Sequence, residues 1–147
     1  MADIENITTV EFKTLDKDVQ ELITAAIDAR TRAHCPYSNF PVGAAIRTKC
    51  GQIFKGCNIE SCTHTPSICA ERTAIAKAVS EGYKEIVAVA VIGQQEKAFT
   101  TPCGVCRQFM SEFAEKDIPI YVAKPAAITV MVTSLFKLLP HRFKLNP

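Results

Sequence analysis

Three cysteines and one glutamate have types and spacing that suit zinc chemistry. A Cys-Ala-Glu segment at 69–71 is followed, 34 positions after its cysteine, by a Pro-Cys-Gly-Val-Cys segment at 102–106. Three thiolates, from Cys69, Cys103 and Cys106, can take three corners of a zinc tetrahedron and leave the fourth to water, as catalytic zinc sites do. Glu71 is placed to handle the proton of that water. These residues predict a zinc-activated water molecule.

Two other uses of the cysteines are a structural zinc site and a redox-active Cys-x-x-Cys pair. A structural site normally has a fourth protein ligand at similar spacing. The remaining four cysteines form no second close pair; they are Cys35, Cys50, Cys57 and Cys62. The pattern therefore favours a catalytic metal site. A ligand-x-Glu segment followed by Pro-Cys-x-x-Cys is also the signature of zinc-dependent nucleobase deaminases.

Length and composition indicate one ordinary globular domain over residues 1–147, because 48% of the residues are hydrophobic and 22% are charged. The net charge of +2 and the absence of a long basic run disfavour nucleic acid as a partner. No apolar stretch approaches 18 residues, and the first thirty do not resemble a signal peptide, so we expect no membrane partner. Seven irregularly spaced cysteines suit reduced thiols and a cytoplasmic location.

The elements that must position these residues alternate along the chain. Hydrophobic periodicity, the position of Gly82 and short apolar runs predict four helices and five strands. The helices are expected at 16–33, 68–81, 104–113 and 134–139, and the strands at 42–47, 52–56, 86–92, 118–123 and 128–132. The run 86–92 is almost wholly apolar, as in a central strand covered on both faces. We therefore expect a three-layer α/β/α sandwich with a five-stranded mixed sheet.

This layout places the expected zinc ligands at the starts of two helices. Cys69 opens one helix, and Cys103 and Cys106 open the next. Unpaired N–H groups and the positive end of the helix dipole favour thiolate over thiol there. Arg72, beside the site, is expected to withdraw negative charge from the sulfurs. A solvated helix arginine is the alternative interpretation of Arg72.

Four segments, taken in order, resemble the motifs of the cytidine deaminase family. They read CPYSNFPVGA at 35–44, GCNIE at 56–60, CAERTA at 69–74 and PCGVCRQ at 102–108. The resemblance implies hydrolytic deamination of cytidine and 2′-deoxycytidine to uridine and 2′-deoxyuridine, with release of ammonia. It also implies one zinc ion per subunit and a homotetramer of α/β subunits with shared active sites. Such enzymes act in pyrimidine salvage.

The resemblance also implies roles for particular residues. Phe40 would pack against the pyrimidine, and Asn58 and Glu60 would hydrogen-bond the ribose hydroxyls. The backbone at Ala70 and Thr101 would contact the base. Without the resemblance, Phe40 could equally be a core residue, and the alternation of Asn58 and Glu60 is typical of a solvated strand face. The 3′-hydroxyl is common to both substrates, so these residues do not rank cytidine against 2′-deoxycytidine.

In the family mechanism, the residue that matches Glu71 binds the ring edge of the base and shuttles protons. A phenylalanine near the C-terminus reaches into a neighbouring subunit's pocket, and Phe143 is the matching residue.

The sequence departs from the family motifs at two places. His64 replaces a tyrosine of the usual pattern. It could make the site pH-sensitive, or it could serve as a fourth zinc ligand, which would close the position left open for water. Lys144 and Leu145 replace the usual Gly-Pro after Phe143.

Two rival functions come from other classes. A nucleic-acid-editing deaminase would keep the metal motif but would need a basic, aromatic groove, whereas only 7% of the residues are aromatic and none is tryptophan. A zinc-stabilised binding protein without catalysis would have a blocked fourth position at the metal.

Overall fold

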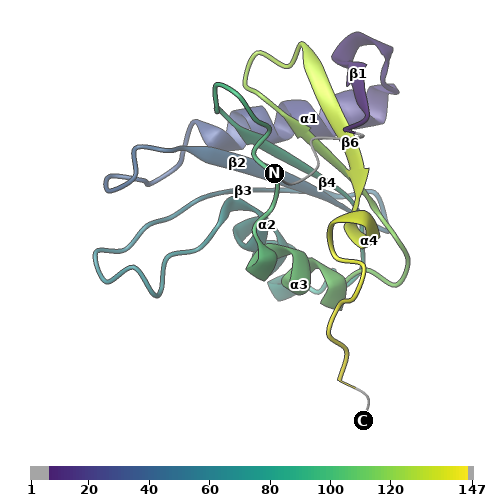
Figure 1. Ribbon diagram of the computed structural model, residues 1–147. Helices are drawn as coiled ribbons and strands as arrows, with labels where there is room; N and C mark the ends of the chain where they lie inside the picture. Colours follow the sequence, from purple (N-terminus) through teal and green to yellow (C-terminus); the bar gives the residue numbers. More distant parts are fainter. Residues whose placement is uncertain (1–6, 146–147) are drawn as a thin grey trace.

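A six-stranded mixed sheet runs through the middle of the molecule (Figure 1). In the computed structural model, which describes residues 7–145, the strands lie side by side in the order β1-β6-β5-β4-β2-β3. Their bounds are β1 Thr9–Glu11, β2 Val42–Thr48, β3 Ile53–Cys57, β4 Ile86–Gly93, β5 Pro119–Ala123 and β6 Thr129–Ser134. The β4–β5 pair is parallel and the other pairs are antiparallel. The expected mixed sheet is confirmed.

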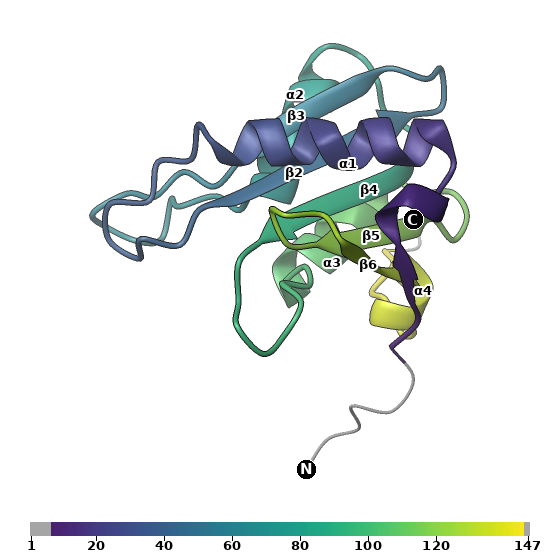
Figure 2. The same ribbon diagram turned by 90° about the horizontal axis from the view of Figure 1, so that it is seen from above.

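Helices cover both faces of this sheet. Helix α1, Lys17–Arg30, crosses one face, and Figure 2 shows it from above. Helices α2, Ala70–Ser80, and α3, Gly104–Glu112, cover the other face together with the short helix α4, Leu135–Leu138. A single 3₁₀ turn, Phe12–Thr14, precedes α1. Buried side chains form one cluster under each helical layer. The three-layer sandwich is therefore confirmed.

The predicted number of strands was wrong by one. The sheet has six strands because β1 pairs antiparallel with β6, with Val10 opposite Val130. Three residues are too few to display the alternation that identifies a strand in a sequence. The edge of β6 supplies the hydrogen bonds that keep β1 extended.

The predicted helices were correct in number and slightly too long. Helix α1 ends at Arg30 instead of residue 33, and Asp16 occupies its N-cap position. Helix α2 begins at Ala70 because Ile68 is still extended and forms a β-bridge with Ile59. After α2, Gly82 adopts φ +94°, a left-handed conformation that costs glycine little. No helix in residues 7–145 is long and apolar enough to cross a membrane.

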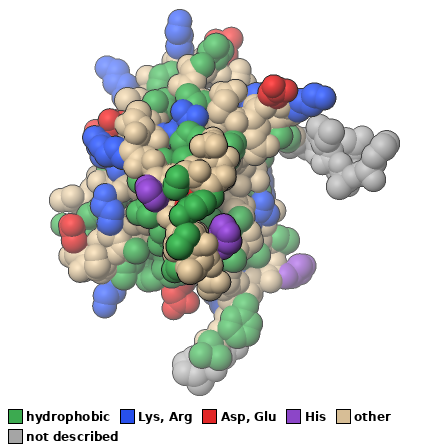
Figure 3. Space-filling view, turned by 90° about the vertical axis from the view of Figure 1, so that its left-hand side faces the viewer, with side chains coloured by type: hydrophobic (Ala, Val, Ile, Leu, Met, Phe, Trp, Pro, Cys, Tyr) green, Lys and Arg blue, Asp and Glu red, His purple; other side chains and the backbone are tan. Residues whose placement is uncertain are grey.

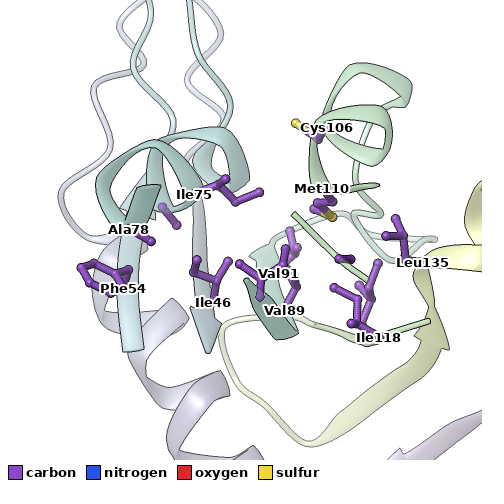
Figure 4. Close-up of a cluster of buried hydrophobic side chains, with 14 of the residues drawn as sticks. Ile46, Phe54, Ile75, Ala78, Val89, Val91, Cys106, Met110, Ile118 and Leu135 are labelled. Carbon is purple, nitrogen blue, oxygen red and sulfur yellow. The ribbon is translucent and has the colours of Figure 1, made fainter. Parts of the chain in front are cut away.

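Hydrophobic side chains lock α2 and α3 onto the sheet. Ile75 of α2 and Met110 of α3 are fully buried against Ile46 and Val91 of the central strands (Figure 4). Each such side chain contributes about 1.5–3 kcal/mol by its burial. Cys106 lies at the upper edge of this cluster, with its sulfur pointing away from the core towards α2 (Figure 4). The core thus fixes the N-terminal ends of both helices next to each other.

Candidate active site

The three cysteine sulfurs meet where α2 and α3 begin. Cys69 is the N-cap residue of α2, Cys103 is the N-cap residue of α3, and Cys106 lies in the first turn of α3. Their Sγ atoms all lie within 4.8 Å of one another, and those of Cys69 and Cys103 are 3.9 Å apart. A tetrahedral zinc ion with bonds of about 2.3 Å separates its sulfur ligands by about 3.8 Å. The donor set and its spacing therefore suit zinc.

Cys69 and Cys106 lie close enough to shift each other's pKa in opposite directions. The Cys106 thiol donates a hydrogen bond to the sulfur of Cys69 and, with help from Arg72, lowers the pKa of Cys69 to about 5. The same hydrogen bond, followed by burial and the charge of Glu71, raises the pKa of Cys106. One of the two cysteines is therefore a ready thiolate near neutral pH, and a cation that binds both must displace the other proton.

Arg72 lies against this sulfur cluster. Its Nη2 atom donates to Cys69 Sγ at 3.6 Å, while its Nε atom is buried and has no hydrogen-bond partner in the described part of the chain. A guanidinium beside thiolates partly neutralises their charge. The position of Arg72 fits the role that the sequence suggested better than that of a solvated helix arginine.

Glu71 is the buried carboxyl of the site. The residue is 4% exposed in the first turn of α2. Burial, reinforced by the negative charge of Cys69, raises the pKa of Glu71 to about 7. A carboxyl group with such a pKa can both accept and donate a proton near neutral pH. The surroundings of Glu71 thus bring its pKa into the range that acid–base chemistry at neutral pH requires.

A cavity of about 310 Å³ opens in front of Glu71, Cys69 and Cys103, whereas Cys106 does not line it. That size lies at the small end of the usual range for ligand pockets, about 300–1,000 Å³. Its lining includes the predicted residues Phe40, Asn58, Glu60, Cys69, Ala70, Glu71, Thr101 and Cys103. Three further lining residues, Ser38, Val42 and Thr100, were not predicted, although each lies within two positions of a predicted one. Their closeness in sequence to predicted residues was the signal that could have identified these three.

Asn58 and Glu60 hold the loop that carries Phe40. Asn58 Oδ1 accepts from the Val42 N–H at 2.8 Å, and its Nδ2 donates to the Phe40 carbonyl at 2.9 Å. Glu60 Oε1 accepts from the N–H groups of Tyr37 and Ser38, both at 3.1 Å. Hydrogen bonding from Ser38 lowers the pKa of Glu60 below its ordinary value. Both side chains line the cavity and also shape its wall.

Comparison with known proteins decides the family. A family model described as the cytidine and deoxycytidylate deaminase zinc-binding region matches residues 16–122. The chain belongs to this deaminase family.

Other members of the family cover most of the chain. It is 46% identical over 127 residues to a probable cytidine deaminase of Dictyostelium discoideum, spanning 86% of this chain and 84% of that protein. It is 43% identical to a cytidine deaminase of Sporosarcina psychrophila, spanning 86% and 91% of the two chains. The crystal structure of a cytidine deaminase from Burkholderia pseudomallei superposes with a TM-score of 0.79 at 41% identity, covering 84% of this chain and 98% of that one.

The two places where this deaminase departs from the family motifs lie outside the sulfur cluster. His64 has φ +59°, and its ring packs edge-on against Tyr37, with centroids 5.9 Å apart. It does not belong to the metal-binding group found among residues 7–145. Phe143 does not line the cavity of its own chain. Its side chain is 70% exposed, while its backbone N–H and carbonyl pair with the amide of Gln108.

Proposed function

We propose that this protein hydrolyses cytidine and 2′-deoxycytidine to uridine and 2′-deoxyuridine, with release of ammonia. The observation that carries the proposal is a cluster of three cysteine sulfurs beside one small cavity, which Cys69, Cys103 and the buried Glu71 line. The names of its relatives point to the same reaction.

Cys69, Cys103 and Cys106 would hold one zinc ion per subunit. Bound there, zinc would act as a Lewis acid that lowers the pKa of a water molecule. The fourth position of the tetrahedron would be free for that water, since the three sulfurs are the donors that the described residues bring together. Arg72 would offset part of the thiolates' negative charge through its contact with Cys69.

Glu71 would move the protons of the reaction. In its ionised form it accepts a proton from the water that attacks C4 of the cytosine ring. In its protonated form it would donate that proton to N3; it would then take the second proton from the new hydroxyl on C4 and pass it to the departing amino group, so that ammonia leaves. A pKa near 7 keeps both forms accessible at neutral pH. The water supplies the oxygen of the uracil product, and the reaction needs no other reactant.

The remaining cavity residues would bind the nucleoside. Phe40 would form an apolar wall for the pyrimidine, and the backbone at Ala70 and Thr101 would contact its polar edge. Asn58 has a second N–H on Nδ2, and Glu60 has a second oxygen, Oε2; these would reach the ribose hydroxyls. Each residue would therefore hydrogen-bond the loop through one atom and the nucleoside through another.

We also propose that residues 1–147 form one deaminase domain that assembles into a cytoplasmic homotetramer. Phe143, exposed at the C-terminal end, would then enter the active site of a neighbouring subunit. The seven cysteines are all free thiols, which suits a reducing compartment.

A small nucleoside suits this molecule better than single-stranded nucleic acid. On the face that Figure 3 shows, lysine and arginine side chains lie mainly near the outline and acidic ones are interspersed among them. A groove for a nucleic-acid backbone would instead need a continuous basic track. The net charge of the whole chain is only +2.

The test is ammonia release from cytidine and from 2′-deoxycytidine, with zinc per chain measured on the same sample. We expect turnover of both nucleosides and about one zinc per chain. Removing the metal with a chelator should abolish turnover, and added zinc should restore it. Zinc binding without turnover would overturn the proposed activity and support a binding protein.

A further inference from the structure

Arg107 joins three separate segments next to the active site. It lies on α3 directly after Cys106, and its side chain turns back towards the start of the helix. Nε donates to the Pro102 carbonyl at 2.7 Å and Nη2 donates to Thr101 Oγ1 at 3.3 Å. Nη1 donates to the carbonyl of Leu138, the last residue of α4, at 2.9 Å. Each nitrogen of the guanidinium therefore holds a different acceptor.

Two of these acceptors belong to the segment that builds the site. Thr101 lines the cavity, and the next two residues are the buried Pro102 and the sulfur-bearing Cys103. This segment has no regular secondary structure of its own, so no sheet or helix ladder fixes its path. The side chain of Arg107 supplies hydrogen bonds that such a ladder would otherwise provide.

The third acceptor belongs to an element that is itself firmly held. Leu135 of α4 is fully buried, and its N–H donates to the Ile118 carbonyl. The Phe136 N–H donates to Asp117 Oδ1 at 2.8 Å, and Ser134 caps the helix through the Lys137 N–H. Helix α4 is therefore tied to the start of β5 and serves as an anchor. Arg107 connects the site segment to this anchor.

We propose that Arg107 is a positioning residue that fixes the Thr101–Cys103 backbone, and with it one zinc ligand and one wall of the nucleoside pocket. The inference rests on the proposed function, because it assigns Arg107 to the same zinc and nucleoside site. The role is distinct from that of Arg72, which touches a sulfur directly. Arg107 acts through directed hydrogen bonds to two backbone carbonyls and to the Thr101 hydroxyl.

This distinction makes lysine the informative replacement. Lysine keeps the positive charge but has a single nitrogen on a flexible stem, so it cannot reach three acceptors in fixed directions. If charge alone mattered, Arg107→Lys would behave as wild type. If the three directed N–H donors of the guanidinium are required, Arg107→Lys should make the segment that carries Cys103 more mobile.

The matched control is Arg47→Lys. Arg47 on β2 also ties separate segments together, since Nη1 donates to the Gly51 carbonyl and Nη2 to the Asp18 carbonyl and to Glu21. It does not line the cavity. The two substitutions thus remove similar numbers of hydrogen bonds, one near the site and one away from it.

The experiment measures transfer of zinc from the loaded, full-length protein to a chromogenic chelator. We expect Arg107→Lys to accelerate the transfer about 10-fold or more, and to lower kcat/KM for cytidine by about 10- to 100-fold, the usual range for residues that orient metal ligands. Arg47→Lys should leave both quantities near the wild-type values. The melting temperatures of the two variants should fall by similar amounts. Arg107→Gln, which can reach only one of the acceptors, serves as a second variant if the lysine protein does not fold.

Wild-type rates of zinc transfer in the Arg107 variants would overturn the inference. So would equal acceleration in Arg47→Lys, because that would reveal a general loosening of the fold. Zinc transfer requires no turnover. An inactive wild-type protein that shows the expected difference between the variants would therefore overturn the proposed activity but not the positioning role.

Discussion

At the scale of single residues, Glu71 combines burial with a proposed role in proton transfer. Among residues 7–145 it is the only buried acidic residue. Glu71→Gln keeps the size of the side chain but removes the exchangeable carboxyl proton. We expect ammonia release from cytidine to fall by about 10²- to 10⁴-fold, the usual contribution of a general acid–base group. Zinc per chain, measured by metal analysis, should stay near one because the three sulfurs are unchanged.

The control for Glu71 is Glu81→Gln, at the exposed C-terminal end of the same helix. It should retain wild-type turnover. Near-normal activity in Glu71→Gln would remove Glu71 from the mechanism, and loss of zinc would indicate a structural role instead.

A second residue-scale prediction concerns Glu60 and pH. Hydrogen bonding from Ser38 lowers the folded-state pKa of Glu60 below the ordinary value of 4.5. The folded protein therefore favours the ionised form, and this contribution to stability is present above pH 4.5 and is lost as the pH falls through the lower, folded-state pKa. Glu60→Gln should melt at a lower temperature than wild type at about pH 6, and the two melting temperatures should converge towards about pH 3.

Zinc loss in acid affects both proteins, so the difference between them isolates Glu60. The exposed Glu81 at the end of α2 offers the control, Glu81→Gln. A gap between wild type and Glu60→Gln that widened as the pH fell would contradict the prediction.

The chemistry of the candidate site was easier to predict than the hydrogen bonds that hold its residues in place. Cys69 and Glu71 are only two positions apart, so they are close in any fold, and their residue types strongly limit the chemistry that the site can perform. The hydrogen bonds of Asn58 with the Phe40–Val42 backbone depend on a loop that returns from 16 or more positions away. Arg107 reaches 31 positions along the chain to Leu138. Contacts over such separations leave no periodic signal in a single sequence.

At the scale of elements, Gly56 allows β3 and α2 to approach closely. A Cβ atom there would collide with the Ala70 carbonyl and the Ala74 N–H, both backbone groups of α2. Backbone cannot move aside as a flexible side chain can, so Gly56→Ala should shift the start of α2, where Cys69 lies. We expect a loss of about 2–3 kcal/mol in unfolding free energy, typical of overpacking, measured by denaturant unfolding of the zinc-loaded protein.

Gly104→Ala provides the contrast. Apart from its chain neighbours and the backbone of its own helix, a Cβ atom at Gly104 would meet no heavy atom within 4 Å. This substitution should therefore leave the stability within about 0.5 kcal/mol of wild type, as for most surface changes. A tolerated Gly56→Ala would mean that α2 can slide on β3 without cost.

The elements themselves were largely predictable where the pattern was long. The apolar run of β4 and the periodicity of α1 correctly indicated a central strand and a surface helix. Their ends were less predictable, because ends depend on tertiary contacts, as the bridge between Ile59 and Ile68 delays the start of α2. The edge strand β1 was missed because its strand conformation depends on a partner more than a hundred positions away.

At the scale of the whole molecule, hydrophobic groups gather on the outer side of α3 and the C-terminal end. Val105, Phe143 and Leu145 are 62%, 70% and 82% exposed. Val105 also lines a largely apolar hollow of about 570 Å³ along α3. A protein surface with several such groups in one region is typical of an interface. The proposed homotetramer would cover this region and complete each active site with a neighbour's Phe143.

Val105→Glu tests this assembly. A buried, unpaired carboxylate opposes association strongly, so the molar mass from light scattering should fall from four chains of 16.1 kDa towards one. Activity should fall with it, and more steeply at low protein concentration, because each pocket would lose the side chain that a neighbour supplies. Ile128 lies directly before β6 and is 74% exposed, so Ile128→Glu should change neither quantity. A fully active wild-type monomer would show instead that one chain builds a complete pocket, and that the exposed groups on α3 serve another purpose.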